Sequence, residues 1–193
     1  MSIIVNIRGT NGSGKSSAVR ALMKHLGKPR AFLFDDREAG YRFKRTPPIF
    51  VLGKYKTACG GLDASFSYNG AAADVLLCLD LLAEKGHVVC EGVVAMSSYG
   101  FGRLTNFADA QKAKGNTVVF ALLDTPAEVC VKRVRERRKA AGNVTPFDPG
   151  KLLDKYVSVV RAQEQLQKAG YDARILPHEE PLQTLLRWFT ERK

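Results

Sequence analysis

Apolar residues fall into two kinds of segment along the chain, and these segments predict its strands and helices. Short apolar runs that end at glycine, proline or charged positions are typical of buried strands. Longer segments with apolar residues three or four positions apart are typical of helices. Strands are predicted at 3–7, 31–34, 87–90, 117–123 and 173–176, and helices at 15–26, 69–85, 104–114, 127–140, 151–169 and 181–191.

The alternation of strands and helices predicts an α/β fold. Crossover helices between successive strands give right-handed βαβ units, and hence a parallel sheet with helices on both faces, in three αβα layers. The exception is a β-hairpin predicted over 41–56, with its turn at 46–48. Because 193 residues suffice for one core, a single domain over 1–193 is expected, with ligands at the carboxyl ends of its strands.

The segment between the first strand and the first helix spells GTNGSGKS, which fits the phosphate-binding pattern G-x-x-x-x-G-K-S. Its glycines let backbone N–H groups turn inward around phosphate oxygens, and the helix N-terminus adds a partial positive charge. Lys15 is predicted to reach the β- and γ-phosphates of ATP, and the Ser16 hydroxyl to ligate Mg²⁺. The predicted nucleotide-binding residues are Gly9, Thr10, Asn11, Gly12, Ser13, Gly14, Lys15, Ser16 and Ser17.

Charged side chains follow the second predicted strand directly. In a kinase, an aspartate there can accept the proton of the attacking hydroxyl, and an arginine can hold the acceptor. Asp35 is therefore the first candidate for the base, ahead of Asp36 and then Asp63, and Arg37 is a candidate acceptor ligand. A polar strand end or a helix cap is the structural alternative for these aspartates.

Two further elements carry candidate catalytic charge. Glu91 ends an apolar strand, where a carboxylate can orient Mg²⁺ through water or orient the attacking group, unless it is a cap or a surface acid. Residues 132–139 hold six cations, which form a solvated helix face, grip an acceptor backbone or belong to a lid. Arg133 and Arg137 share a helix face and are predicted to neutralise the phosphoryl group from a lid over 133–152, centred on 138–152, whose segment 141–150 is expected to be flexible.

The net charge of +11 is unusually high for a kinase that binds only free nucleotides. Such an excess predicts a polyanionic partner, most simply nucleic acid, although a merely basic surface is the alternative. Scattered cysteines and histidines show no metal or disulfide spacing, which favours a reducing cytoplasm. No apolar run is long enough to span a membrane, and no signal peptide is expected.

Much of this charge lies near the predicted hairpin. Between Lys28 and Lys56 there are eight lysines or arginines against three acids, interleaved with aromatic residues. Cations pair with phosphates and aromatic rings stack on bases, although Phe43 and Phe50 could instead pack on each other across the hairpin. The segment 41–63 is therefore predicted to bind the acceptor. Its candidate substrate residues, with Arg37, are Tyr55, Lys56, Cys59, Gly60, Gly61 and Asp63.

These motifs together resemble those of P-loop kinases of the nucleoside, nucleotide and polynucleotide kinase group. The resemblance rests on the phosphate loop, on Asp35-Asp36-Arg37, on residues 89–92 and on residues 124–126 before the arginine-rich helix. The sequence KYKTACGGLD at 54–63 resembles a narrower set of bacteriophage kinases. Those enzymes phosphorylate 5-hydroxymethyluracil bases within DNA, as a step toward hypermodified thymidines.

That resemblance implies a P-loop kinase fold, ATP and Mg²⁺ as cofactors, DNA as a partner and a location in the host cytoplasm. It also implies an acceptor base that leaves the duplex to reach the γ-phosphate. Two other functions stay open on the residues alone: a kinase of a free nucleoside, nucleotide or small metabolite, and an NTPase without an acceptor. The oligomeric state and the choice between ATP and GTP are also open, with the stretch after Leu176 as the candidate purine site.

Overall fold

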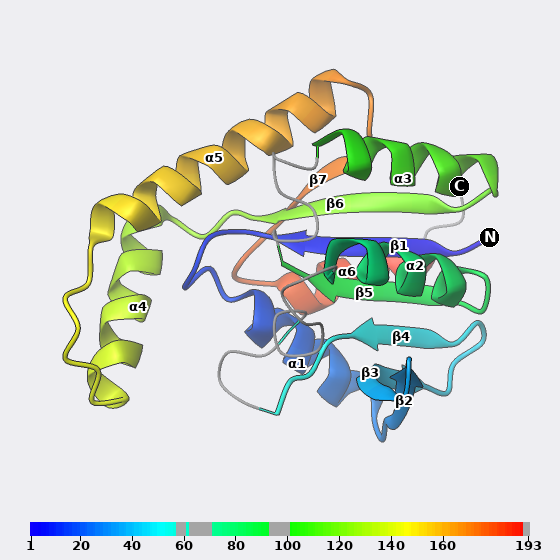
Figure 1. Cartoon of the computed structure of the whole chain (residues 1–193), viewed down its shortest axis with the longest axis horizontal. Helices are drawn as coiled ribbons and strands as arrows, with labels where there is room; N and C mark the ends of the chain where they lie inside the picture. Colours follow the sequence, from blue (N-terminus) through cyan, green and yellow to red (C-terminus); the bar gives the residue numbers. More distant parts are fainter. Residues whose placement is uncertain (57–60, 62–70, 93–100, 191–193) are drawn as a thin grey trace.

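The computed structural model describes residues 1–56, 61, 71–92 and 101–190, and its centre is a seven-stranded sheet (Figure 1). Across the sheet the strand order is β2-β3-β4-β5-β1-β6-β7. In chain order the strands are β1 (Ile3–Arg8), β2 (Arg30–Phe34), β3 (Arg37–Phe43), β4 (Ile49–Leu52), β5 (His87–Glu91), β6 (Thr117–Leu123) and β7 (Ala173–Leu176). Each predicted strand is present, within a few residues of its predicted bounds.

The sheet is mixed, which corrects the expectation of a parallel sheet. Strands β4, β5, β1, β6 and β7 run parallel to one another, as predicted for βαβ units. Strand β3 is antiparallel to both β2 and β4, because short turns rather than crossover helices join these three. Residues 41–43 do pair with 49–51, but β4 also pairs with β5. The segment predicted as an inserted hairpin therefore extends the main sheet.

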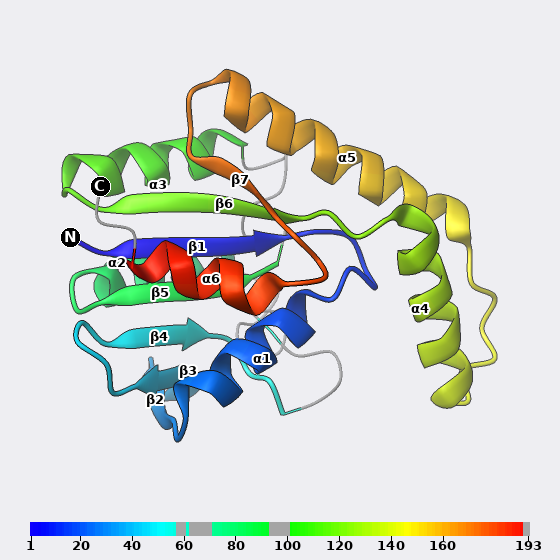
Figure 2. The ribbon, with the colours of Figure 1, turned by 180° about the vertical axis from the view of Figure 1, so that it is seen from behind.

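Helices cover both faces of the sheet, as Figures 1 and 2 show from opposite sides. Helices α2, α3 and much of α5 lie on one face, and α1 and α6 lie on the other. Their bounds are α1 (Lys15–Leu26), α2 (Ala71–Ala83), α3 (Phe101–Ala113), α4 (Ala127–Ala140), α5 (Pro149–Lys168) and α6 (Pro181–Thr190). None of the helices in the described part of the chain is long and apolar enough to cross a membrane.

The core has two halves because the side chains of a strand alternate between the faces of the sheet. On β1, Ile4 packs with Leu79 of α2 and Phe107 of α3. Val5 and Ile7 point the other way and pack with α1 and α6, including Leu22 and Trp188. Both faces of the central strands are thus buried, so that the carboxyl ends of β1 and β5 are held in a fixed relation.

Helix α4 and the start of α5 project beyond the carboxyl ends of the strands (Figure 1). They pack on each other through a small apolar cluster of Cys130, Val134 and Leu152, with Val131 and Phe147 at its margin. This helix pair forms one wall beside the loop that joins β1 to α1. The predicted lid residues lie in this pair and in its connecting turn.

Candidate active site

The loop between β1 and α1 is held closely against helix α4. Gly12 has φ +82°, and a β-carbon there would lie 2.5 Å from the carbonyl oxygen of Cys130. Just before this helix, the Thr125 hydroxyl donates a 2.7 Å hydrogen bond to the carbonyl oxygen of Ser13. Gly14 adopts the left-handed conformation directly before α1 begins. The glycines are therefore needed for conformation and close packing, as the motif predicted.

Lys15, the first residue of α1, lies across this loop. Its Nζ donates hydrogen bonds to the carbonyl oxygens of Gly9, at 3.0 Å, and Thr10, at 2.9 Å. The ammonium group is thereby kept over the concave side of the loop, where it also lines a cavity. A cation in this place neutralises phosphate oxygens that the loop amides hold.

Ser16 and Glu91, the two predicted metal ligands, are in direct contact. The Ser16 hydroxyl donates a 2.6 Å hydrogen bond to Oε1 of Glu91. This contact forms because Glu91 ends β5 opposite Ile7 of β1, while Ser16 lies in the first turn of the helix that follows β1. A hydroxyl and a carboxylate beside a phosphate-binding loop are the oxygen ligands that Mg²⁺ takes together with phosphates. The residues present therefore fit this ion.

Glu91 also contacts the segment that follows β4. A β-carbon on Gly61 would lie 2.5 Å from Oε1 of Glu91, so a side chain at this position would displace the carboxylate. Gly61 is held there by two backbone hydrogen bonds with Lys54. Tyr55 is buried nearby, and burial, together with the Glu91 charge, raises the pKa of its phenol well above the usual value. Glu91 thus lies between the glycine-rich loop and the chain after β4.

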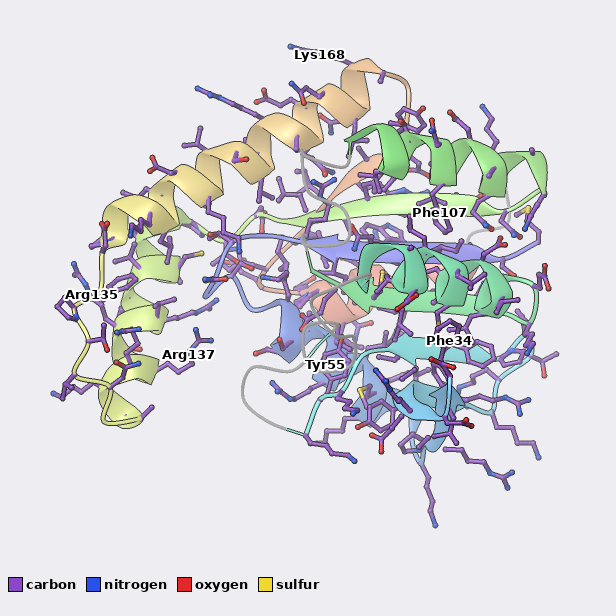
Figure 3. All side chains as sticks on the ribbon, in the orientation of Figure 1. Phe34, Tyr55, Phe107, Arg135, Arg137 and Lys168 are labelled. Carbon is purple, nitrogen blue, oxygen red and sulfur yellow. The ribbon has the colours of Figure 1, made fainter. Side chains whose placement is uncertain are left out.

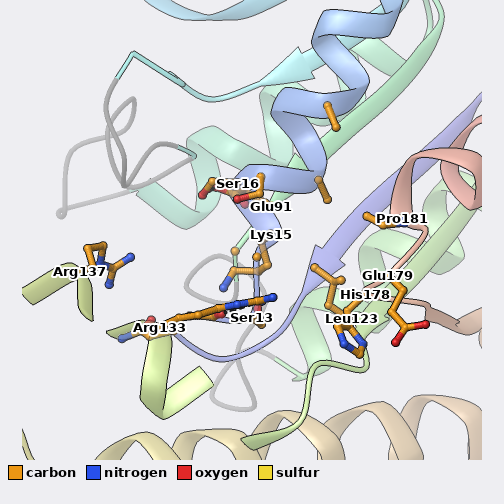
Figure 4. Close-up of a pocket in the computed structure, with 17 residues that line it drawn as sticks. Ser13, Lys15, Ser16, Glu91, Leu123, Arg133, Arg137, His178, Glu179 and Pro181 are labelled. Carbon is orange, nitrogen blue, oxygen red and sulfur yellow. Dashed lines mark hydrogen bonds between the residues drawn. The ribbon is translucent and has the colours of Figure 1, made fainter. Parts of the chain in front are cut away.

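The glycine-rich loop, Lys15, Ser16 and Glu91 line a cavity of about 810 Å³, large enough for a nucleotide (Figure 4). Arg133 and Arg137 of α4 border it on one side, and Arg133 donates a 3.4 Å hydrogen bond to the carbonyl oxygen of Gly12. Arg135 points to a different side of α4 and is not among the cavity residues of the described chain (Figure 3). Arg133 and Arg137, which helical spacing places on one face of α4, thus both border the cavity.

On the opposite side, the cavity is bordered by His178, Glu179 and Pro181, which follow β7 (Figure 4). Asp124, at the end of β6, fixes the histidine: its Oδ1 accepts a 2.7 Å bond from the His178 backbone N–H and lies 2.9 Å from Nδ1. The stretch after Leu176 was expected beside the purine, but no role was predicted for His178 or for Asp124 itself. The available signal was their position just beyond the carboxyl ends of neighbouring strands.

Proteins similar over most of their length share one description. A 5-hmdU DNA kinase of Pseudomonas phage PaMx11 is 31% identical over 172 residues, which cover 86% of each chain. The chain belongs to this kinase family. A 5-hmdU DNA kinase of Pseudomonas phage M6 is 27% identical over 186 residues, or 94% of each chain. One of Delftia phage PhiW-14 is 31% identical over 182 residues, which cover 86% of this chain and 65% of that protein. No family profile matches the chain.

As a member of this family the protein is a phosphotransferase. The aspartates predicted to activate its acceptor follow β2, far across the sheet from the glycine-rich loop. Strand β2 is the outermost strand, and three strands separate it from β1. At the usual spacing of ~4.8 Å, its end lies about 19 Å across the sheet from β1. Asp35 and Asp36 form the β2–β3 turn, both with positive φ, and Arg37 begins β3. None of the three lines the cavity of the described chain.

The aromatic residues considered for base stacking are buried in this structure, which favours the alternative that they are core residues. Phe43 is fully buried against α1 and α6, and Phe50 is buried in the core half that faces α2 and α3. They also do not pack on each other, because Phe43 pairs with Ile49 in the register. Tyr55 is buried as well, whereas Lys56 is exposed and pairs with Glu38 at 2.8 Å, which lowers the pKa of that carboxyl.

The other predicted features of the kinase are the acceptor residues in 41–63 and the lid. Of the acceptor residues expected in 41–63, Cys59, Gly60 and Asp63 lie outside the described residues, while Gly61 contacts Glu91. In the predicted lid, Arg138 donates a 3.0 Å hydrogen bond to Oδ1 of Asn143 and lies over the Phe147 ring. Arg138 therefore stabilises the α4–α5 connection, and it is not among the cavity residues of the described chain.

Proposed function

We propose that this kinase transfers the γ-phosphate of ATP to the hydroxymethyl group of 5-hydroxymethyluracil in DNA, with Mg²⁺ bound. The observation that carries the proposal is the Ser16–Glu91 contact, which joins the glycine-rich loop to the chain after β4 at the rim of a nucleotide-sized cavity. The acceptor is taken from the descriptions of the similar phage proteins.

The donor nucleotide fits the loop side of the cavity. Backbone N–H groups of the loop and the N-terminus of α1 hold phosphate oxygens, and Lys15, Arg133 and Arg137 neutralise their charge. The purine then lies toward His178 and Glu179, on the far side of the loop from α4. Ser16 and Glu91 hold Mg²⁺, which supplies charge neutralisation on the transferring phosphate.

The acceptor side is proposed to be the segment after β4, residues 53–63. This segment contacts Glu91 through Gly61, whose missing side chain leaves the carboxylate beside the loop. Asp63 follows two residues later in the chain, and we assign to it the removal of the proton from the attacking hydroxyl. Asp35 and Asp36 lie at the outer turn of the sheet and are not assigned this role.

The α4–α5 pair is proposed to act as a lid over the donor phosphates. It carries Arg133 and Arg137 on the side that faces the cavity, and it packs against the loop at Gly12. Closure over a base that has left the duplex would exclude water from the transfer step. Both arginines would then approach the transferring phosphate.

Transfer of γ-³²P from labelled ATP tests the proposed function. The acceptors are duplex DNA with 5-hydroxymethyluracil, the same duplex with thymine, free 5-hydroxymethyldeoxyuridine, and its monophosphate. Label on the modified duplex and not on the thymine duplex is the expected result. Label on the free nucleoside or nucleotide alone would make the protein a small-molecule kinase. ATP hydrolysis with label on no acceptor would instead indicate an NTPase.

A further inference from the structure

The excess of positive over negative charge lies in two regions of the chain. Residues 20–56 carry ten lysines and arginines against three acids, and residues 127–140 carry six against two. The rest of the chain holds fourteen cations and fourteen acids. The net charge of +11 therefore comes entirely from these two segments.

Only one of these segments contributes cations to the nucleotide-sized cavity. Arg133 and Arg137 of the second segment line it, whereas Ala21 is the sole cavity residue that the described chain contributes from 20–56. The larger charge excess, on the segment that forms the end of α1 and strands β2 to β4, is therefore not used by the donor phosphates. It needs a different anionic partner.

Six exposed cations of this segment gather at the amino-terminal side of the sheet, and we call them the basic edge: Lys24, Lys28, Arg30, Arg42, Lys44 and Arg45. They come together because α1 ends, β2 begins and β3 ends on this side. Arg45 ties the group together, since its guanidinium donates a 3.3 Å hydrogen bond to the carbonyl oxygen of Leu26 at the end of α1. Figure 3 shows nitrogen-tipped side chains that project outward around β2 and β3.

Acids do not balance the basic edge. The acids of the segment, Asp35, Asp36 and Glu38, lie toward the opposite end of the β2–β3 hairpin, and Glu38 is paired with Lys56. No ion pair found among the described residues includes a member of the basic edge. The six charges therefore face solvent together.

Two members of the basic edge occupy an unfavourable register. Arg30 of β2 stands directly opposite Arg42 of β3 in the antiparallel ladder, and both side chains are exposed. Directly opposed residues have β-carbons about 5 Å apart, and like charges at this spacing destabilise the pair. A charged side chain on an edge strand also prevents pairing with another sheet. One cation is enough for that role, so it does not explain why two arginines stand opposite each other. A phosphate between two guanidinium groups turns their repulsion into attraction.

We propose that the basic edge docks the phosphate backbone of duplex DNA beside the reacting nucleotide. This inference rests on the proposed function, because it takes the duplex as the polyanion. Arg42 lies two strands from β5, and its register partner Phe50 pairs with Val88, three residues before Glu91. Strand spacings then place the Cα atoms of Arg42 and Glu91 about 14 Å apart. That distance corresponds to about four base pairs of B-DNA along the helix axis.

The test compares the double variant Arg30→Gln/Arg42→Gln with the wild-type protein. Fluorescence anisotropy measures the Kd for a labelled 20-base-pair duplex with one 5-hydroxymethyluracil, without ATP, from 50 to 200 mM salt. We expect the Kd to rise about tenfold and the slope of log Kd against log salt to fall by about two, one for each lost phosphate contact. In transfer assays, KM for the duplex should rise while kcat and the KM for ATP are unchanged.

The matched control is Arg161→Gln/Arg187→Gln, which removes two exposed arginines from α5 and α6, outside both basic segments. It should keep the wild-type Kd and salt slope, and circular dichroism should show that both variants are folded. The docking surface is overturned if the edge variant binds like the wild type, or if the control loses as much affinity. It is also overturned if the edge variant loses binding to a polyglutamate peptide but keeps binding to DNA.

Failure of the proposed function gives a different result. In that case the wild type labels no modified duplex, whereas the anisotropy comparison still reports on the basic edge without turnover. DNA binding that depends on Arg30 and Arg42, in a protein that phosphorylates only the free nucleoside, would support the docking surface and overturn the assigned acceptor.

Discussion

The Ser16 hydroxyl and the Glu91 carboxylate meet at 2.6 Å although 75 residues separate them in the chain. The parallel pairing of β1 with β5 brings them together, because it aligns the end of one strand with the end of the other. A Mg²⁺ ion at this position would touch a residue of the glycine-rich loop and a residue beside the acceptor segment.

Glu91→Gln should lower kcat about 100-fold, because an amide ligates Mg²⁺ more weakly than a carboxylate does and Gln has nearly the same size beside Gly61. Steady-state transfer at increasing Mg²⁺ measures the effect, and the Mg²⁺ concentration for half-maximal rate should rise. A variant with wild-type kcat and Mg²⁺ dependence would remove Glu91 from the metal site.

Lys15→Met should lower kcat/KM by about 1,000-fold or more, since it removes the cation that lies over the loop. Its circular dichroism and melting temperature should match those of the wild type, because the ammonium group bonds to carbonyl groups of the loop at the cavity and lies outside the apolar core. Lys155→Met, on the exposed side of α5, is the control and should keep full activity. Turnover retained by Lys15→Met would overturn the assignment of this loop.

Gly61→Ala should reduce transfer about tenfold or more, because the added β-carbon would lie 2.5 Å from Oε1 of Glu91. Gly115→Ala separates this effect from backbone strain. Gly115 also has positive φ, at +78°, but a β-carbon there meets nothing within 4 Å. Both variants should lose roughly 1 kcal/mol of stability, measured by urea unfolding. Equal activity in the two variants would show that Gly61 does not position Glu91.

Asp63→Asn should lower kcat by about 100-fold or more, whereas Asp35→Asn should leave kcat within about threefold. Asn tolerates the left-handed conformation that Asp35 adopts in the β2–β3 turn, so the fold should not suffer. Single-turnover transfer to the modified duplex measures both rates. The opposite ranking would return the base to Asp35 and require the outer hairpin to reach the acceptor.

Stability should fall as the pH drops below about 6.5, the ordinary pKa of histidine, through His87. Burial lowers the pKa of this side chain, whose Nδ1 accepts a 3.0 Å hydrogen bond from the backbone N–H of Ile3. The unfolded chain therefore binds the proton more readily, which favours unfolding in acid. His87→Asn keeps an acceptor and cannot titrate. Its unfolding free energy should change less between pH 7 and pH 5 than that of the wild type.

The parts of the fold that the sequence predicted correctly are those that local pattern determines. Helix α1 begins after Gly14 and ends before Gly27, where the glycine signals placed it. The loop, Lys15 and Ser16 form one contiguous motif, so their arrangement follows from a strand before it and a helix after it. The contact of Glu91 with Ser16 depends in addition on the pairing of β5 with β1, which the local pattern does not determine.

The other predictions depend on which strands are neighbours, and periodicity does not encode this. The run that forms β2 looks the same whether it lies beside β1 or at the outer edge. Only the two aspartates, which tolerate positive φ, indicated a two-residue turn. For the aromatic residues of β3 and β4, base stacking and packing within the hairpin were both open, because charged residues surround them in the sequence. Since both faces of these strands are covered, Phe43 and Phe50 are buried on opposite sides.

Because Gly12 packs on the carbonyl group of Cys130, a tilt of α4 would have its pivot at this contact. A rotation of the helix about it moves Arg133, less than one turn away, very little. Arg137 lies seven residues from Cys130, about 10.5 Å along the helix, so a rotation of about 10° moves its backbone by about 2 Å. Arg133 would therefore stay beside the loop, whereas Arg137 would approach the cavity only when the helix tilts.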